Sequence, residues 1–271
     1  MLTLLDDRAL LAVTGTEARA FLQGLITNDV EKLTPQNALY AALLTPQGKI
    51  LFDFLLVEGD GAILIDCART SQEGLQKRFN MYKLRSNVTI EPRGQLAAVA
   101  STLAISRPGF VSYVDPRNAG LGHRGIGAKA EVPLGTPLTE TYVVSRLKLG
   151  VPEGGDFGSE RIFALDAGLE ELHAVDFHKG CYVGQELTAR MKHRGAARKR
   201  LLPIECLRAE SLPQRGTAVM AADREIGEIT STYGPKGFAL IRLDHLDSTG
   251  AQSITAGQVA IRIDKPSWLF P

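Results

Sequence analysis

The first third of the chain alternates apolar runs that are typical of strands with amphipathic stretches that are typical of helices. Residues 10–33 begin as a strand, turn at Gly15 and continue as a helix. Residues 38–66 hold three apolar runs separated by the turn sequences TPQGK and EGDG, which predicts an antiparallel meander. A second helix is expected at residues 69–84, and short strands follow in SNVTIEP and LAAVAST.

Two later changes of pattern divide the rest of the chain. The segment TYVVSRLKLG predicts a helix that ends at Gly150, because a glycine followed closely by proline stops a helix. From Leu201 onward the chain shows short β-rich runs split by glycine, proline and aspartate, which is typical of a small barrel or sandwich. We therefore expect a region 1–195 and an all-β domain 196–271.

Composition narrows the class of protein. A length of 271 residues suits two domains, and 44% apolar with 23% charged residues suits a protein with a folded core. The 31 basic and 30 acidic residues leave a net charge of +1, which does not argue for direct nucleic-acid binding, although a local basic patch could still bind RNA. Direct nucleic-acid binding is not expected. No apolar run reaches the ~18–20 residues needed to cross a bilayer, so no membrane contact is expected.

Location is inferred from the first residues and the cysteines. The sequence MLTLLDDRALLAV has no basic leader and no small-residue cleavage site, unlike a targeting segment. Cys67, Cys181 and Cys206 are odd in number and far apart, which suits a reducing compartment and excludes a disulfide framework. We expect a cytoplasmic protein.

Cys181 stands in the glycine-containing segment DFHKGCYVGQELTAR, residues 176–190. Helical spacing begins at Gln185, although the pattern also allows a strand through ELTARMKHRG. A helix there places the thiol ahead of an amino terminus that favours negative charge. With His178 and Lys179 beside it, the thiol is expected to have a lowered pKa and to be reactive. The alternative is a small buried hydrophobe, which is the usual role of a free cysteine.

A run of basic residues follows this segment. Residues 190–200, RMKHRGAARKR, contain six lysines or arginines and no acid. Such a run is commonly a solvated turn between domains. Because it lies close to Cys181, we expect it to form a wall that binds an anion, such as a polyglutamate tail, a phosphate or an acidic partner.

The segment HKGCYVGQE resembles the signature of the YgfZ family of folate-binding proteins. This family is related to the T-protein of glycine cleavage, and mitochondrial iron–sulfur assembly factors of the same branch share the signature. Further stretches agree in order: FLQGLITNDV, TPQGKILFDFLL, YKLRSNVTI, VDPRNAGLGHR and GEITS. The resemblance implies an α+β fold with T-protein-like modules around a central folate-sized hole and a small C-terminal β-barrel. It divides the first region into two intertwined subdomains, roughly residues 1–45 plus 130–195 and residues 46–129.

The resemblance also implies a function. It is that of a folate-binding accessory protein that supports assembly or repair of iron–sulfur enzymes, including enzymes that modify tRNA. The expected partners are iron–sulfur proteins or assembly factors, and the expected cofactor is tetrahydrofolate or a derivative. Cys181 is the central functional residue, with Lys179 beside it. One cysteine cannot supply the four ligands of a cluster, so Cys181 would share a cluster or form a transient adduct.

The alternative function is a tetrahydrofolate-dependent aminomethyltransferase of the T-protein type. T-proteins read two adjacent acids where this chain has Phe52 and Asp53, so Asp53 is the candidate acid or base. The cysteine signature, which T-proteins lack, favours the accessory role.

Residues expected to contact the folate follow from the same resemblance. Arg8 and Tyr142 stand where some members have tryptophans, and either side chain can stack on a flat ring. The full set is Arg8, Arg85, Tyr142, Tyr182, Gln185, Glu186 and Arg190. Arg117 is a further candidate, although it could simply close a turn after Asp115.

Overall fold

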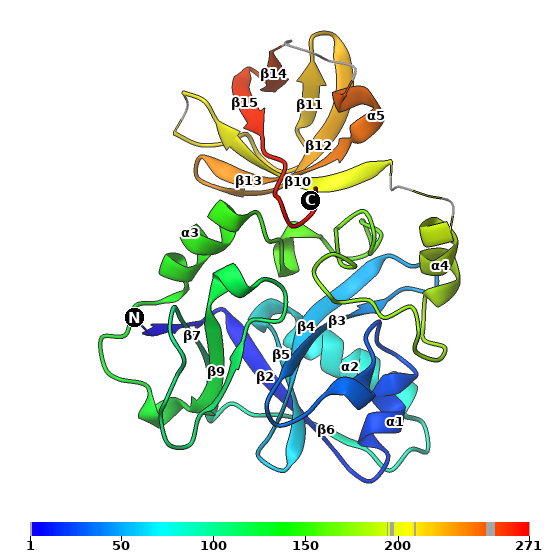
Figure 1. The fold of residues 1–271 in the computed structure, drawn as a ribbon, viewed down its shortest axis with the longest axis vertical. Coiled ribbons are helices and arrows are strands. Elements are labelled where there is room, and N and C mark those ends of the chain that lie inside the picture. The colour runs from blue at the N-terminus through cyan, green and yellow to red at the C-terminus, as the bar shows by residue number, and fades with distance from the viewer. Residues whose placement is uncertain (1, 194, 196–197, 209, 248–252, 271) are drawn as a thin grey trace.

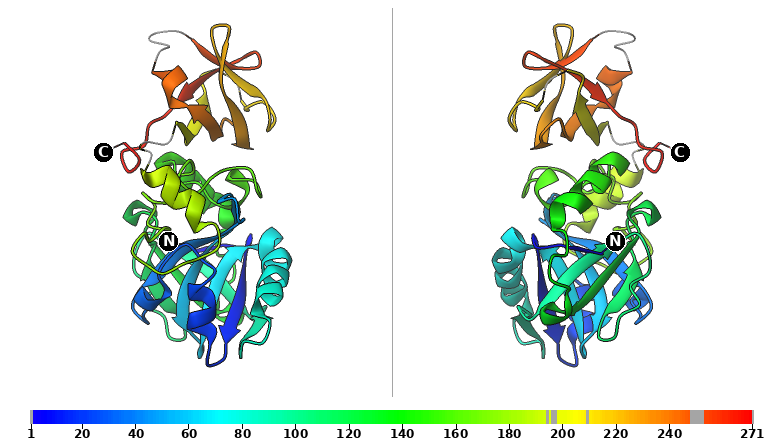
Figure 2. Two further views of the ribbon diagram at one scale, coloured as in Figure 1. Left: turned by 90° about the vertical axis from the view of Figure 1, so that its right-hand side faces the viewer. Right: turned by 90° about the vertical axis from the view of Figure 1, so that its left-hand side faces the viewer.

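The computed structural model describes residues 2–193, 195, 198–208, 210–247 and 253–270. These residues form two antiparallel sheets, a closed barrel and a long segment, residues 151–175, that we call the covering segment. Figure 1 shows the barrel stacked on a lower body that contains both sheets, with helix α3 at the junction. The side views of Figure 2 show the same two-part arrangement, with the barrel at one end of the long axis.

The larger sheet has five antiparallel strands and is buried on both faces. Its strands, in spatial order, are β3 (Ala38–Leu44), β4 (Ile50–Gly59), β5 (Ala62–Ala68), β2 (Arg8–Thr14) and β6 (Thr89–Pro92). Burial on both faces explains the nearly continuous apolar runs. Alternate residues of β4 enter different cores: Phe54 packs with helices α1 (Ala18–Gln23) and α2 (Gln72–Lys83), and Leu55 faces the opposite side. The predicted meander is confirmed.

The smaller sheet has four strands. In spatial order they are β1 (Leu2–Leu4), β7 (Leu96–Ser101), β9 (His123–Ala128) and β8 (Val111–Val114). The predicted division at residue 45 does not follow the two sheets. Strands β3 and β4 lie on either side of that boundary, yet they pair from Ala38 opposite Val57 to Leu44 opposite Ile50. The hairpin register therefore keeps residues 38–68 in one unit.

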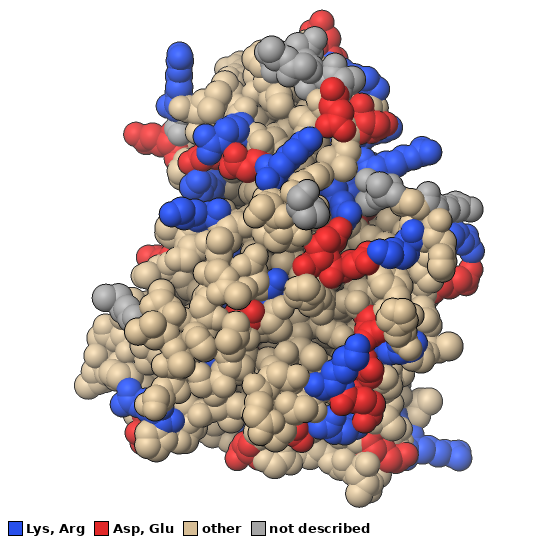
Figure 3. All heavy atoms as spheres, viewed as in Figure 1, with Lys and Arg blue, Asp and Glu red and all other residues tan. Residues whose placement is uncertain are grey.

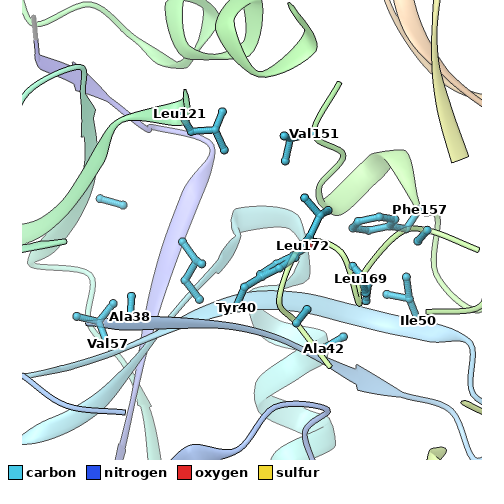
Figure 4. Close-up of a cluster of buried hydrophobic side chains, with 14 of the residues drawn as sticks. Ala38, Tyr40, Ala42, Ile50, Val57, Leu121, Val151, Phe157, Leu169 and Leu172 are labelled. Atoms are coloured by element: carbon cyan, nitrogen blue, oxygen red, sulfur yellow. The ribbon is translucent and has the colours of Figure 1, made fainter. Parts of the chain in front are cut away.

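A covering segment links the sheets to the barrel. Helix α3 (Thr139–Leu149) ends at Gly150, which takes φ 67°, as the sequence predicts. Residues 151–175 then cover the face of the larger sheet opposite α1 and α2 and complete the core there. Figure 4 shows Tyr40 of β3 pointing toward Leu172 of this segment, with Leu169 and Phe157 nearby. Helix α4 (Gln185–His193) follows at the edge of the lower body.

The barrel has six strands and confirms the predicted C-terminal β-barrel. Its closed order is β10 (Lys199–Cys206), β13 (Lys236–Arg242), β12 (Arg224–Tyr233), β11 (Ala218–Ala221), β14 (Ile254–Ala256) and β15 (Val259–Ile263), and helix α5 (Leu243–Leu246) follows β13. The tail after β15 returns to the junction, where Trp268 Nε1 donates to the carbonyl oxygen of Leu149 at 3.0 Å. This bond fixes the barrel's end against α3.

Short 3-10 helices complete the described elements: η1 (Val30–Lys32), η2 (Arg69–Ser71), η3 (Ala119–Leu121), η4 (Lys129–Glu131) and η5 (Gly154–Asp156). Within the described ranges, no helix combines the length and apolar character needed to cross a membrane.

Candidate functional site

Cys181 lies in the loop before α4, residues 173–184, which we call the cysteine loop. Its side chain is exposed, whereas those of Cys67 and Cys206 are buried. Cys67 belongs to the core between the larger sheet and its helices, where burial raises the pKa of its thiol to about 12. Cys206 belongs to the barrel core. The three thiols are thus in three environments, and Cys181 is the accessible one.

Lys179 anchors the cysteine loop. Its Nζ donates to the carbonyl oxygens of Gln23 at 2.8 Å, Ile26 at 2.7 Å and Asn28 at 2.7 Å. An ammonium group has three donors, so these bonds use all of them. Burial lowers the pKa of Lys179 to about 8, with Asp29 and Asp176 opposing that shift. The geometry makes Lys179 a positioning residue, because its donors point at backbone carbonyls.

The same stretch of chain holds the start of the loop. The backbone N–H of Asp176 donates to the carbonyl oxygen of Thr27 at 3.0 Å, and the Thr27 hydroxyl donates to the carbonyl oxygen of Ala174 at 2.6 Å. The Asp176 carboxylate accepts from the backbone N–H of His178 at 2.7 Å and pairs with Lys32. Burial alone would raise the pKa of Asp176, but Lys32 and the backbone donors lower it. The loop is therefore fixed on both sides of Phe177.

The two glycines that flank Cys181 have different roles. Gly184 has φ 84°, and a Cβ there would lie 2.6 Å from the carbonyl oxygen of Thr45. Close packing on the turn between β3 and β4 therefore requires glycine at that position. A Cβ at Gly180 would meet no heavy atom of the described residues within 4 Å. Gly180 leaves open space next to the exposed thiol.

Four other residues expected near the cofactor lie in α4 or just before it. Tyr182 is buried, and burial raises its pKa to about 12. Glu186 and Arg190 are exposed and form an i,i+4 ion pair at 2.6 Å. Gln185 is half-buried at the first position of the helix. These residues share the neighbourhood of Cys181 and lie far along the chain from the other predicted folate contacts.

The basic run does not form the expected continuous anion-binding wall. Lys192 pairs with Glu170, Arg200 pairs with Glu171 at 2.6 Å, and Arg190 pairs with Glu186. Glu186 lies one helical turn before Arg190 in α4, whereas Glu170 and Glu171 come from the covering segment, outside the run. Figure 3 shows acidic and basic atoms adjoining one another on this side of the molecule. Arg194, Ala196 and Ala197 of the run lie outside the described residues.

Asp53 faces the centre of the lower body. Its neighbour Phe52 points to the other side of the sheet, where its ring lies 3.2 Å from the Cβ position of Gly74 in α2. The Asp53 carboxylate accepts from the Tyr40 hydroxyl at 3.0 Å and from the backbone N–H of Gly154 at 2.9 Å. Burial raises its pKa, while Arg8 opposes the shift. Both carboxylate oxygens are therefore occupied.

A buried network of charges surrounds that carboxylate, and we call it the central ion cluster. Its members are Arg8, Asp66, Asp115, Arg117, Arg124, Arg146, Glu153 and Asp156. Arg124 bridges Asp66 at 2.8 Å and Asp115 at 3.0 Å, and Arg8 also binds Asp66, at 2.7 Å. Each arginine therefore faces at least one carboxylate, which is what buried charges require.

Glu153 contacts several arginines of the central ion cluster. It pairs with Arg117 and lies 3.3 Å from Nε of Arg146. Burial alone would raise the pKa of Glu153, but Arg117, Arg146 and Arg124 outweigh it and hold the pKa well below its usual range. Arg146 also binds Asp156 at 2.6 Å, and Asp156 accepts from the barrel's Ser231. The cluster thereby connects the sheets to the barrel.

Tyr142 is enclosed by the same cluster. Its hydroxyl accepts from Arg117 and, at 3.0 Å, from Arg124, and the Arg124 guanidinium lies 5.1 Å from the centre of its ring. A pterin stacked there would have to displace Arg124. Arg8 already forms a salt bridge with Asp66 at 2.7 Å. In this arrangement the central residues do not fit a folate.

The predicted folate contacts occupy three separate places. Arg8 and Tyr142 lie in the centre, whereas Tyr182, Gln185, Glu186 and Arg190 lie around the cysteine loop. Arg85 is exposed after α2 and lines a shallow cavity with Glu17. Asp66, Arg124, Arg146, Glu153 and Asp156 were not predicted. A charged residue within an apolar pattern, such as Asp66 in ILIDCA, is the signal that could have identified them.

Comparisons with known proteins place the chain in a family. It is 33% identical to "Iron-sulfur cluster assembly factor IBA57, mitochondrial" of Homo sapiens, over 97% of this chain and 84% of that protein. The Mus musculus protein of the same name is 32% identical with the same coverage. The chain belongs to the IBA57 family. Residues 198–271 match the family model "CAF17, C-terminal beta-barrel domain".

The fold is also found in a solved structure. "Crystal structure of glycine cleavage system aminomethyltransferase T from Bartonella henselae" matches 98% of this chain and 85% of that one, with a TM-score of 0.76 and 14% identity. This confirms the predicted T-protein-like fold. The predicted resemblance to iron–sulfur assembly factors is confirmed at the level of the IBA57 family. The cytoplasmic location is wrong, because these relatives are named as mitochondrial.

Proposed function

We propose that this IBA57-family protein is an accessory factor in the assembly or repair of iron–sulfur proteins and that it acts through Cys181. The observation that carries the proposal is an exposed thiol on a loop that Lys179 fixes through three hydrogen bonds. Relatives that share nearly the whole chain are named iron–sulfur cluster assembly factors. The recipients would include enzymes that modify tRNA.

The positions of the three cysteines define what the chain can contribute to a cluster. A [2Fe–2S] or [4Fe–4S] cluster commonly takes four cysteine ligands. Cys67 and Cys206 are buried in separate cores, so neither can join Cys181 at one cluster without unfolding. Cys181 would therefore supply one ligand to a cluster in transit, and an iron–sulfur protein, an assembly factor or a small thiol would supply the others.

The loop's own residues would prepare Cys181 for this role. The thiol must lose its proton to bind iron, and an exposed position lets water accept that proton. Gly180 leaves space on one side, so a partner's backbone can approach the sulfur. Lys179 and Asp176 hold the loop in place while the ligand is exchanged. The chain thus contributes a fixed, accessible donor atom.

A bound tetrahydrofolate stays a prediction from the family resemblance. With Arg124 over Tyr142 and Arg8 bound to Asp66, the central side chains do not fit a folate as they stand. Stacking of a folate on Tyr142 would require Arg124 to leave the tyrosine ring. No step of the proposed function passes through the cofactor.

The aminomethyltransferase alternative has support from the fold alone. Its candidate acid, Asp53, accepts hydrogen bonds on both oxygens and has a pKa raised by burial. A catalytic base must reach the substrate's proton within hydrogen-bond distance. Asp53 is 5% exposed, so substrate access would require the central ion cluster to open. The accessory role needs no such opening and is the better supported function.

The test is complementation of cells that lack their own IBA57-family protein. Cys181→Ser is expected to abolish recovery of iron–sulfur enzyme activity while keeping the thermal midpoint of the wild type, because the side chain is exposed. Cys206→Ala is the control, since it removes a buried thiol from the barrel. Full recovery with Cys181→Ser would overturn the proposal.

A further inference from the structure

A cavity of about 520 Å³ lies between the barrel and the covering segment, separate from the cysteine loop. Its walls come from residues 157–162 of the lower body and from strands β12 and β13 of the barrel, with Lys199 and Arg215 at its edge. The volume falls within the roughly 300–1,000 Å³ that is usual for small-molecule sites.

One wall of the cavity is apolar. Phe157 and Ile162 are 1% and 2% exposed and belong to the core, and Leu240 of β13 is half-buried beside them. The wall is held in place from behind, because Ile50 of β4 donates its N–H to the carbonyl oxygen of Ile162 at 2.9 Å. A ligand with an apolar or aromatic body would find a fixed surface here.

The rim of the cavity carries an excess of positive charge. Four basic residues and two acidic residues line it: Arg161, Lys199, Arg215, Arg242, Glu225 and Glu228. Arg161 binds Glu228 at 2.8 Å, and Arg242 binds Asp244 at 3.1 Å. Across the described part of the chain, no carboxylate forms a salt bridge with Lys199 or Arg215. Lys199 interacts electrostatically with Asp166 without forming a salt bridge, so both cations keep hydrogen-bond donors for a ligand.

The position of Arg215 depends on a glycine in the opposite wall. Gly158 has φ 61°, and a Cβ there would lie 2.0 Å from Nη2 of Arg215. The guanidinium therefore rests directly on the backbone of the covering segment. Any larger residue at position 158 would move Arg215 away from the cavity, so the glycine keeps this cation at the rim.

We propose that this cavity binds an organic anion. Lys199 and Arg215 would hold its phosphate or carboxylate group through charge-assisted hydrogen bonds, and Leu240, backed by the buried Phe157 and Ile162, would contact its apolar body. The site is independent of the function proposed for Cys181. If the cavity binds no organic anion, the function proposed for Cys181 is unaffected.

The experiment is calorimetric titration of the full chain with 1-naphthyl phosphate at low salt. The matched probes are inorganic phosphate, which lacks the apolar body, and 1-naphthol, which lacks the charge. Saturable binding of 1-naphthyl phosphate is expected, at least tenfold tighter than that of either matched probe. Arg215→Gln and Lys199→Gln are each expected to weaken it about tenfold, the usual scale of one charge-assisted hydrogen bond.

Lys77→Gln is the control variant, because Lys77 is exposed on α2 of the lower body. It should bind 1-naphthyl phosphate as the wild type does. Thermal midpoints equal to the wild type would show that the two rim variants are folded, as expected for exposed side chains. The proposal is overturned by absence of saturable binding, by wild-type affinity in both rim variants, or by a matched probe that binds as tightly as 1-naphthyl phosphate.

Discussion

Nζ of Lys179 lies 2.7 Å from the carbonyl oxygen of Asn28 and thereby joins the cysteine loop to a segment 151 positions earlier in the chain. The lysine stands two residues before Cys181, which suggests an electrostatic role at the thiol. Its three donors are instead used on backbone carbonyls near the end of α1. Carbonyls at a helix carboxyl end attract a cation, and this explains why a lysine is buried here.

Replacement of Lys179 by methionine is expected to destabilise the protein by about 2–4 kcal/mol. The variant keeps the aliphatic stem but leaves three carbonyl groups without their donor. Urea unfolding measures the loss, and amide hydrogen exchange should become faster in residues 173–184. Lys77→Met, which removes an exposed cation of α2, should change neither quantity. If Lys179→Met unfolds at the same urea midpoint as the wild type, the anchoring role is contradicted.

The two glycines around Cys181 should respond differently to alanine. Gly184→Ala places a Cβ 2.6 Å from the carbonyl oxygen of Thr45 at a positive φ, and a loss of about 2–4 kcal/mol is expected from strain and overlap. Gly180→Ala meets open space and should change the unfolding free energy by less than about 0.5 kcal/mol. Chemical denaturation of both variants checks this. Equal losses of unfolding free energy in the two variants would show that Gly184 does not pack closely on Thr45.

Local pattern was sufficient to predict most of the secondary structure. The strands on either side of TPQGK, the stop at Gly150 and the helix from Gln185 all depend on neighbours within a few residues. The barrel followed from evenly spaced short strands. The rough boundary near residue 45, which was drawn by analogy, falls within a hairpin, because Leu44 pairs with Ile50 across the turn.

The ion pairs of the central ion cluster could not be predicted from local pattern. Arg8 and Asp66 are 58 residues apart, as are Asp66 and Arg124, and no periodicity relates them. The acids that neutralise the basic run, Glu170 and Glu171, also lie outside it. Sequence reasoning located the exposed cysteine because its glycine and charged neighbours are local. It did not identify the charged partners, because they are distant in sequence and become neighbours only in the folded chain.

Arg124→Met should be among the most destabilising single changes in the lower body. It leaves Asp66 and Asp115 each without one cation in a site that excludes water, and loss of one partner of a buried pair costs about 3–5 kcal/mol. Urea unfolding with tryptophan fluorescence provides the measurement. Arg262→Met, which breaks two exposed pairs on the barrel, should keep the wild-type midpoint. Similar midpoints for the two variants would mean that the cluster is hydrated.

Asp166 supplies a pH-dependent test of the joint between the lower body and the barrel. Its carbonyl oxygen accepts from the backbone N–H of Leu201 at 2.8 Å, and burial raises the pKa of its carboxyl to about 6, against the opposing effect of Arg200 and Lys199. The folded state therefore binds more protons than the unfolded state between the ordinary pKa of 3.8 and about 6. Stability from this group is present below that window and is lost as the pH rises through it.

Asp166→Asn removes this titration and should therefore become progressively more stable than the wild type as the pH rises from about 4 to about 6, with a constant difference above about pH 7. The change across the window is expected to be about 1–3 kcal/mol, since one pKa unit corresponds to about 1.4 kcal/mol. Urea unfolding of both proteins at matched pH values measures the difference, in which the other titrating groups cancel. A difference that is constant from pH 4.5 to 7.5, or one that falls as the pH rises, would show that the Asp166 carboxyl is solvated and ionised in the folded protein.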